Sequence, residues 1–290
     1  MLSFSVMEIV NFCSNTMEKY EENREEPLMT LQMLISSVGQ DAHALIAKMQ
    51  PECDCILVNQ KMPYGYEEFD YQGHQIRCFQ MEEKGVGLSR NHALLRADRD
   101  ICLFADEDIV YKKGYARAVM QAFEEHPQAD MLLFNVEVAP ERRTYWIENF
   151  HPVRLYNCGR YPAYSFALRT ERMHELNLTY HLWFGGGARY SNGEDSLFIR
   201  DCIKKGMKVF AVPVTIGEEI PRPSTWFNGY NDKFFYDRGV LYHYLYGRLA
   251  PLMGARFLYK HGKTMCEQFP MAQAKQLMKA GYRLEPMSKE

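Results

Sequence analysis

The stretch ICLFADEDIVY, residues 101–111, places three consecutive carboxylates directly after an apolar run of core-strand length. Carboxylates this close together repel one another, and burying them unpaired costs free energy. They therefore need a position at the rim of the core, where water or a ligand can reach them. The elements on either side of this stretch indicate where that rim lies.

Apolar runs alternate with helical periodicities along most of the chain. Short apolar runs predict strands, and apolar residues spaced three or four apart predict helices. The predicted strands cover residues 31–38, 53–60, 74–80, 101–105, 130–138 and 208–216. The predicted helices cover residues 41–50, 89–97, 111–126 and 192–206, with two more around Pro251. The segment with Pro63 and Gly65 is predicted to be a loop. This succession indicates an open, mainly parallel sheet with helices on both faces.

Polar side chains follow two of the predicted strands, at the edge where such sheets bind ligands. Asp106, Glu107 and Asp108 follow one strand, and Asn59 and Gln60 end another. Side chains alternate along a strand, so Asp106 and Asp108 are expected to point the same way and Glu107 elsewhere. Two such carboxylates suit Mg²⁺ or Mn²⁺, which take hard oxygen ligands and share positions with phosphate. A solvated acidic turn is the alternative interpretation.

Composition and charge narrow the class of protein. The 290 residues are 47% hydrophobic and 24% charged, with a net charge of −3, which is ordinary for a globular protein and does not favour nucleic acid as a partner. No apolar run of about 18 residues predicts a membrane span. No signal peptide is evident and the eight cysteines are scattered, which favours a cytoplasmic protein. Residues 239–259 predict an amphipathic helix, either packed on the protein or in contact with a membrane surface.

Three further segments carry candidate site residues. In KGVGLSRNHAL, residues 84–94, a glycine pair precedes a predicted helix start, where free N–H groups favour anions, and Lys84 and Arg90 add positive charge. An ordinary turn with a capping residue is the alternative. In WFGGGARYSNGEDSLF, residues 183–198, Glu194 and Asp195 lie in a first helical turn. They either complement the helix dipole or include a general base. Glu218 and Glu219 follow the last predicted strand and are candidate metal ligands.

Taken in order, these segments resemble family 2 glycosyltransferases of GT-A type over residues 31–239. GVGLSRNHALLRA, residues 85–97, resembles the family's G-x-x-x-A-R-N-x-G-x-x-x-A helix, with Ser89 in place of the usual Ala. ICLFADEDIVYKKGY, residues 101–115, resembles its strand and D-x-D motif. GGGARYSNGEDSLFIRDCIKKGMKV, residues 185–209, resembles its E-D helix and the strand that follows. The segment 224–239 is similar to that of bacterial members associated with capsule and surface polysaccharide synthesis.

The resemblance implies a fold, a domain organisation and a reaction. The fold is a three-layer α/β/α sandwich with a mostly parallel central sheet and C-terminal helices. The implied domains are an N-terminal extension at 1–28, a GT-A domain at 29–225 and a helical region at 226–290. The implied enzyme is an inverting hexosyltransferase that moves a sugar from a nucleotide-diphosphate donor, with UDP-sugar expected, to a hydroxyl of a saccharide or lipid-linked acceptor. Homodimer formation and peripheral contact with the inner face of the membrane stay open.

The resemblance also implies roles for particular residues. Asp106 and Asp108 are the expected ligands of Mn²⁺ or Mg²⁺, with Glu218 as a third. Asp195 is the expected catalytic base, with Glu194 as the alternative. The expected contacts to the nucleotide sugar come from Asn59, Gln60, Lys84, Arg90, Asn91 and Asp106.

Two other functions fit parts of the pattern. A sugar nucleotidyltransferase also combines an α/β sheet with a divalent cation, but it usually needs a glycine-rich phosphate loop near the first strand, where ISSVGQDAH holds one glycine. A degenerate GT-A domain, acting as a nucleotide-binding or scaffold protein, would keep the fold without turnover. Retention of the expected carboxylates argues against it.

Overall fold

The computed structural model describes residues 29–140, 143–220 and 229–285. From Leu31 onward these residues form one compact unit. The expected extension at 1–28 and the expected domain boundary at 225/226 lie outside the described residues.

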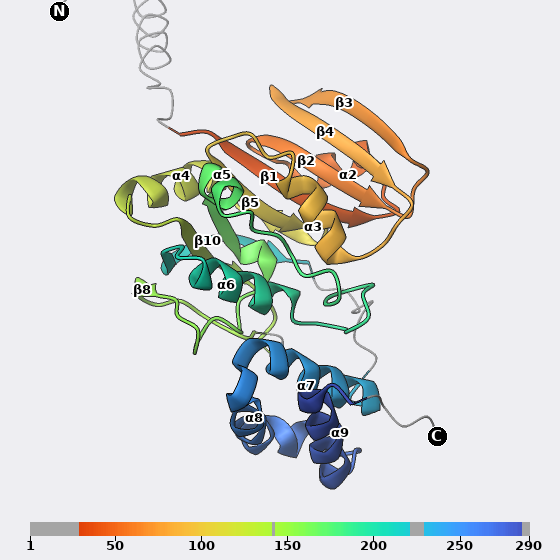
Figure 1. The fold of residues 1–290 in the computed structure, drawn as a ribbon. Coiled ribbons are helices and arrows are strands. Elements are labelled where there is room, and N and C mark those ends of the chain that lie inside the picture. Colours follow the sequence, from red (N-terminus) through yellow and green to blue (C-terminus); the bar gives the residue numbers. More distant parts are fainter. Residues whose placement is uncertain (1–28, 141–142, 221–228, 286–290) are drawn as a thin grey trace, which may run out of the picture. The chain divides into compact units, whose positions relative to one another are not determined.

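A single mixed sheet runs through this unit (Figure 1). Its strands are β1 (Leu31–Val38), β2 (Asp54–Gln60), β3 (Gly65–Tyr71), β4 (His74–Met81), β5 (Ile101–Asp106), β6 (Ile109–Tyr111), β7 (Met131–Glu137), β8 (His151–Pro152), β9 (Phe166–Arg169) and β10 (Val209–Glu219). The spatial order is β3-β4-β2-β1-β5-β9-β7-β10-β6, with β8 paired to β10.

Most strands of the sheet run in one direction. Strands β4, β2, β1 and β5 pair in parallel, and so do β7 and β10. Strand β9 lies antiparallel between β5 and β7, so those two also share a direction. The carboxyl ends of six strands therefore meet at one edge, as the succession of predicted elements requires.

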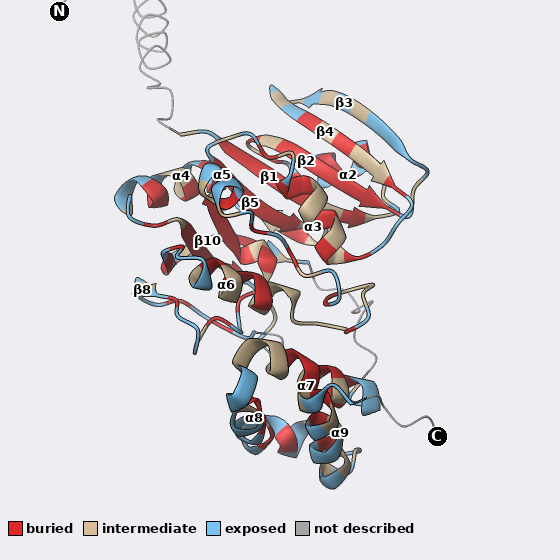
Figure 2. Ribbon diagram, in the orientation of Figure 1, coloured by how far each residue is buried: buried red, intermediate tan, exposed pale blue. Residues whose placement is uncertain are grey.

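Helices cover both faces of the sheet. The helices of the described residues are α2 (Ala42–Met49), α3 (Val86–Leu94), α4 (Tyr115–Glu125), α5 (Thr170–Glu175), α6 (Glu194–Lys204), α7 (Asp232–Tyr246), α8 (Ala250–Met265) and α9 (Met271–Arg283), with 3₁₀ turns η1 (Ala163–Ser165) and η2 (Gly247–Leu249), and the last three helices pack together apart from the sheet. Figure 1 shows α3 and α6 in front of the sheet and α2 behind it. In the front core, Leu94 and Phe198 pack with Leu34 and Phe104. Figure 2 shows that the central strands are buried along most of their length.

Several boundaries differ from the sequence prediction. The segment after Pro63, predicted to be a loop, forms β3, which pairs antiparallel with β4. It escaped prediction because it is a polar edge strand, GYEEFDY, with half-buried and exposed residues and no apolar run. The helix predicted from residue 111 begins at Tyr115, since Ile109–Tyr111 pair with the end of β10. The helix predicted from Ser89 begins three residues earlier, at Val86.

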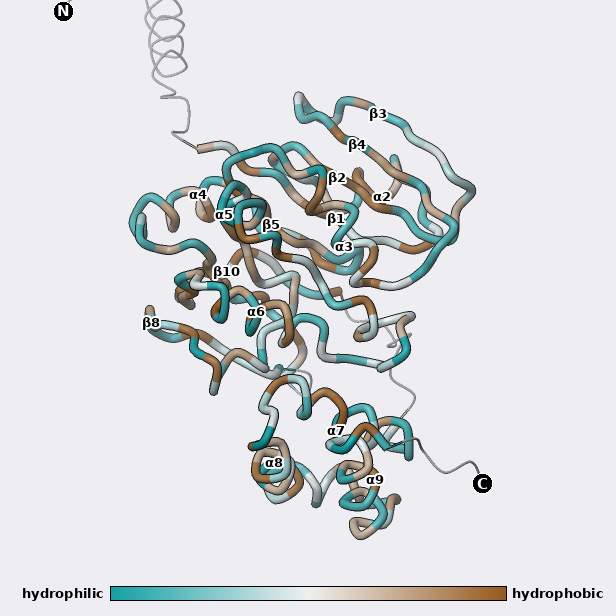
Figure 3. The backbone as a smooth tube through the Cα atoms, in the orientation of Figure 1, coloured by the Kyte–Doolittle hydropathy of each residue, from teal (hydrophilic) through white to brown (hydrophobic). Residues whose placement is uncertain are grey.

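The C-terminal part consists of three helices where two were predicted. Helices α7, α8 and α9 enclose a small core of Phe234, Phe235, Leu258, Ala274 and Met278. A separate cluster joins α7 to α6, with Leu197 packing against Val240 and Leu241. Figure 3 shows hydrophobic and hydrophilic segments alternating along these helices. No helix of the described part of the chain is long and apolar enough to cross a membrane.

Candidate active site

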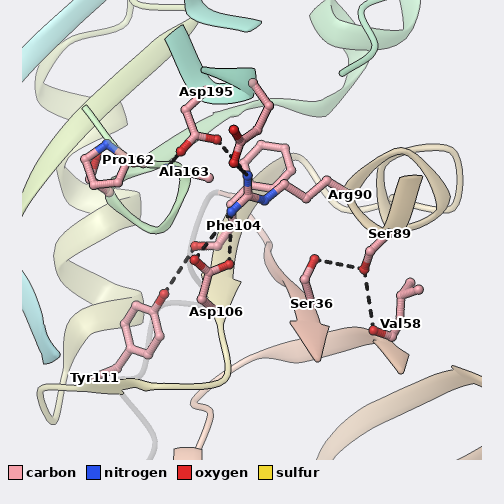
Figure 4. Close-up of polar contacts among 12 residues, drawn as sticks. Ser36, Val58, Ser89, Arg90, Phe104, Asp106, Tyr111, Pro162, Ala163 and Asp195 are labelled. Carbon is pink, nitrogen blue, oxygen red and sulfur yellow. Dashed lines mark hydrogen bonds and ion pairs between the residues drawn. The ribbon is translucent and has the colours of Figure 1, made fainter. Parts of the chain in front are cut away.

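The guanidinium of Arg90 is the centre of the candidate site (Figure 4). It projects from α3 and donates to Asp195 Oδ1 at 2.6 Å, to Asp106 Oδ1 at 3.1 Å and to Glu194 Oε1 at 3.4 Å. The Arg90 side chain is only 4% exposed, and its guanidinium carbon lies 5.3 Å from the ring centroid of Tyr180. One buried cation thus joins the end of β5 to the first turn of α6, at the carboxyl edge of the sheet.

Burial and charge oppose each other at Arg90. Burial works against its positive charge, but Asp195, Asp106 and Glu194 outweigh that effect and hold its pKa well above the ordinary value. A buried cation needs such partners, because desolvation of an unpaired charge costs several kcal/mol. Arg90 therefore stays charged and fixes the positions of the carboxylates around it.

Asp195 combines a restrained position with a perturbed pKa. It lies in the first turn of α6, where its Oδ1 meets Arg90 and its Oδ2 accepts the Ala163 backbone N–H at 3.0 Å. Burial raises the pKa of Asp195 to about 7, with help from Glu194 and Asp106, although Arg90 and the Ala163 N–H act in the opposite direction. A carboxylate with a pKa near neutrality is suited to accepting a proton.

Of the three consecutive acids at the end of β5, the first two point in different directions. Asp106 turns toward Arg90, whereas the Glu107 carboxylate accepts the Val38 backbone N–H at 3.1 Å and so faces the end of β1. This matches the expectation that Glu107 points away from its neighbours. Asp108 follows in a turn, and its carbonyl oxygen accepts the Ile220 N–H at 2.8 Å, which brings the end of β10 beside it.

Glu219, the neighbour of the expected metal ligand Glu218, lies on the side of these acids. Burial raises the pKa of the Tyr164 hydroxyl, and the negative charges of Glu219, Asp106 and Asp108 raise it further. Tyr164 of η1 therefore lies within electrostatic range of all three carboxylates. Glu218 is exposed, and successive strand residues face opposite sides of a sheet. Metal binding by Glu218 stays a prediction, and Glu219 is the better placed of the two.

These carboxylates fit a divalent cation that is shared with a ligand. Among the described residues, no group of three or more His, Cys, Asp or Glu side chains is already assembled to hold a metal. Mg²⁺ does not require such a group, since it is commonly held by one or two carboxylates together with substrate phosphates and water. Asp106 and Asp108 supply hard oxygen atoms of the right kind at the open edge of the sheet.

Asn59 and Gln60, expected to contact the nucleobase, already have internal partners. Asn59 Oδ1 accepts from Ser37 Oγ at 3.0 Å and from Gln40 N at 3.1 Å, while its Nδ2 donates to Gln40 O at 2.6 Å. Gln60 makes two 3.2 Å bonds to the backbone of Gly85. Both side chains are almost fully buried. They hold the loops at the carboxyl edge, and contact with a nucleobase would require these bonds to be exchanged.

Asn91 also has internal partners, whereas Lys84 is exposed. Asn91 Oδ1 accepts the Tyr180 backbone N–H at 2.6 Å, and its Nδ2 donates to the Tyr180 carbonyl oxygen at 3.0 Å. Asn91 lies within α3 and not at its start. Lys84 is exposed, and its Cγ would lie 3.6 Å from a Cβ added at Gly187. The Val86 N–H, in turn, donates to Gly186 O. Of the two, Lys84 is the one exposed to an incoming anion.

Glycine at position 185 lets the triple-glycine loop approach α3. Gly185 has φ +100, and a Cβ there would come 2.6 Å from Val86 Cγ1 and 2.8 Å from Glu194 Cδ. Only glycine accepts both the backbone conformation and the contact. Three consecutive glycines are typical of a pliable loop, but the structure packs this one tightly beside Glu194.

Sequence reasoning missed three groups that border the site: the Ala163 N–H, Tyr164 and Tyr180. All three lie in the segment 141–190, where the hydrophobic pattern loosens. Its richness in tyrosine was the only available signal, and that signal does not select particular residues.

The sheet, the helices on both faces and the acidic turn at the carboxyl edge define a GT-A fold. The sequence model of one family, described as Glycosyl transferase family 2, matches residues 43–190, just over half of the chain. The chain therefore belongs to glycosyl transferase family 2 and is a glycosyltransferase.

Solved structures with a similar fold include the N-terminal part of S. aureus TarS. TarS 1-349 in complex with UDP-GlcNAc is 15% identical, with a TM-score of 0.61 over 89% of this chain and 82% of that one. TarS 1-349 in complex with UDP is 16% identical, with a TM-score of 0.54 over 83% of this chain and 74% of that one. At this identity the likeness concerns the fold. No curated protein sequence matches the chain.

Proposed function

We propose that this glycosyltransferase is a metal-dependent, inverting enzyme that moves a sugar from a UDP-sugar to a hydroxyl group of a saccharide or lipid-linked acceptor. The observation that carries the proposal is the bridge from Arg90 to Asp106 on one side and to Asp195 on the other. It joins a carboxylate suited to a metal–diphosphate to a carboxylate suited to proton transfer. Arg90 thus contacts both the carboxylate proposed for donor binding and the carboxylate proposed for proton transfer.

In this proposal Asp195 is the catalytic base. Its raised pKa of about 7 lets it take the proton of the acceptor hydroxyl as that oxygen attacks the anomeric carbon. The sugar–diphosphate bond breaks on the opposite face, so the configuration is inverted. Glu194, also held by Arg90, is the alternative base.

Asp106 and Asp108 would hold the divalent cation, with Glu219 or Glu218 nearby. The cation would supply Lewis acidity to the departing diphosphate. Arg90 keeps Asp106 oriented before the donor arrives, because its 3.1 Å hydrogen bond fixes that carboxylate. Lys84, exposed beside the triple-glycine loop, would neutralise further phosphate charge.

Support for a uridine nucleotide comes from the structural neighbours. TarS crystal structures contain UDP-GlcNAc and UDP, and TarS shares this fold. The similarity of residues 224–239 to bacterial relatives supports a role in capsule or surface polysaccharide synthesis. UDP-GlcNAc is therefore the first donor to test.

Calorimetric titration of UDP, with and without Mn²⁺, tests this proposal. Wild-type protein should bind UDP tightly only with Mn²⁺, and Asp108→Asn should weaken that binding by at least about 10–100-fold, the range known for disturbed metal sites. Asp98→Asn, an exposed carboxylate paired with Arg77, is the matched control and should bind normally. Equal binding with and without Mn²⁺ would refute the metal role.

Turnover assays with the same protein separate the alternatives. Release of UDP from UDP-GlcNAc in the presence of saccharide acceptors is the expected result. Metal-dependent UDP binding without turnover on a broad panel of acceptors would instead indicate a binding or scaffold protein. Release of pyrophosphate from UTP and a sugar phosphate would indicate a nucleotidyltransferase.

A further inference from the structure

A large groove lies in the C-terminal helices, apart from the sheet edge that carries the candidate active site. It has a volume of about 1140 Å³, above the 300–1,000 Å³ usual for small-molecule pockets, and runs between α8 and α9 with the end of α7 at its border. The helices touch closely where Tyr282 meets Gly254 and where Met271 meets Gly262. Between these contacts the helices leave the groove open.

The floor of the groove is apolar. Pro251, Ala255, Leu258 and Tyr259 of α8 face Met271 of α9 across it. Tyr259 is 93% exposed, and Leu249 and Leu252, at the start of α8, are 60% and 66% exposed. So much uncovered apolar surface in one small helical unit is typical of a contact with a partner or a membrane.

The rim of the groove is cationic, and no acidic residue in the described part of the chain lines it. Five cations line it: Arg248, Lys263, Lys275, Lys279 and Arg283. Among the described residues the one ion pair formed by these five joins Arg283 to exposed Glu285, at 3.4 Å. Residues 229–285 as a whole hold nine Lys or Arg against four Asp or Glu, although the full chain has a net charge of −3. Positive charge is therefore concentrated in this unit.

Three of these cations repeat every four residues on one face of α9. Lys275, Lys279 and Arg283 lie one helical turn apart, and like charges at this spacing destabilise an isolated helix. The arrangement gains stability only when an anion neutralises it. The apolar floor beside the cations requires that this anion also carry a hydrophobic part.

We infer that this groove binds an anionic phospholipid at a bilayer surface, with the lipid phosphate at the α9 cations and the acyl chains along the apolar floor. A soluble polyanion would meet the charges but would leave the floor and Tyr259 uncovered. A neutral apolar partner would cover the floor but would leave the cations unpaired. An anionic lipid would pair with the cations and would also cover the apolar floor. Membrane affinity is known to combine apolar burial with attraction to anionic lipids.

Sedimentation with vesicles tests the inference on the full chain. The protein should bind vesicles of phosphatidylglycerol and phosphatidylcholine and should bind pure phosphatidylcholine vesicles much more weakly. Lys275→Gln/Lys279→Gln should lower the partition coefficient roughly thirtyfold, since each cation near an anionic surface contributes about a factor of five. Tyr259→Ser should lower it as well, because the aromatic ring is lost from the floor.

The matched control is Arg256→Gln/Lys260→Gln. These two exposed cations also lie four residues apart on α8 but do not line the groove, so their loss should change binding less than about threefold. Equal losses in both double variants would overturn the inference, since net charge and not the groove would then govern binding. Undiminished binding of the Lys275→Gln/Lys279→Gln protein would also overturn it.

Two further measurements distinguish other occupants. Soluble glycerol 3-phosphate should not compete with vesicles, and competition at equal phosphate concentration would assign the groove to a free phosphate ligand. A dimer in sedimentation velocity that the Lys275→Gln/Lys279→Gln change dissociates would assign it to a second copy of the chain. UDP binding should be unchanged in these variants, so the inference stands or falls independently of the proposed donor site.

Discussion

The cations of the two sites are held in opposite ways. Arg90 is buried and bonded to three carboxylates, whereas Lys275 and Lys279 are exposed beside an apolar floor. At the sheet edge the protein supplies the counter-charges itself. In the C-terminal groove, none of the described lining residues supplies a counter-charge.

The difference shows what each cation contributes. Arg90 positions the carboxylates of its own site, so its loss should disturb both the fold and the chemistry. The groove lysines do not stabilise the fold, so their loss should weaken what binds there without lowering the free energy of unfolding. The variants below test this distinction, from the largest expected effect to the smallest.

Asp195→Asn should give the largest effect, a fall in kcat of about 10²–10⁴-fold, because a positioned base contributes that much. UDP binding should persist. Wild-type kcat/KM should rise with pH and level off above about 7, since the base must be deprotonated and its pKa lies there. Glycosyl transfer measured between pH 5 and 9 would show both effects.

Two comparisons make that test specific. Asp201→Asn, in the same helix but facing Arg200, should leave kcat and the pH profile nearly unchanged. Glu194→Gln should retain the rise in kcat/KM near pH 7. If Glu194→Gln abolishes that rise and Asp195→Asn does not, Glu194 is the base.

Arg90→Gln should lower the free energy of unfolding by about 3–5 kcal/mol, because it leaves three carboxylates together without their buried cation. Urea denaturation followed by circular dichroism would measure the change. Arg77→Gln, which removes an ion pair with half-exposed Asp98, should cost no more than about 1 kcal/mol. Similar losses in the two variants would mean that Arg90 is not an organising residue.

Substitutions of the neighbouring acids Glu218 and Glu219 on β10 should have smaller effects on UDP binding, and the two effects should differ. Glu219→Gln should weaken Mn²⁺-dependent UDP binding several-fold, since Glu219 shares the surroundings of Tyr164 with Asp106 and Asp108. Glu218→Gln should leave it unchanged, since that side chain is exposed. Titration of both variants decides the question, and the reverse order would restore Glu218 as the third ligand.

Lys279→Gln should give the smallest effect, and of opposite sign. Without lipid it should raise the free energy of unfolding by about 0.2–0.5 kcal/mol for each like-charge pair removed, those with Lys275 and Arg283. The gain should shrink in 1 M salt, where exposed charges are screened. A destabilised variant would show that Lys279 has a structural role, contrary to the proposed contrast.

Much of the scaffold could be predicted from local patterns. Strand Leu31–Val38 matches its prediction residue for residue, and Asp41 caps α2 by accepting the Ala44 N–H at 2.8 Å. Strands β3, β6, β8 and β9 were missed because β3 is polar and the other three have four residues or fewer. Their positions depend on partner strands and not on their own hydrophobic periodicity.

The sequence by itself determined the order of the main strands and helices and the residue types at the sheet edge, because hydrophobic periodicity and capping act over a few neighbouring residues. It could not determine which residues far apart in the chain contact one another. Arg90 meets Asp106 across 16 positions and Asp195 across 105. Only the packing of α3 and α6 on the same face decided those contacts, and only the spacing of α8 and α9 left a groove lined by cations. Contacts of this kind depend on loop paths and side-chain packing that no local pattern encodes.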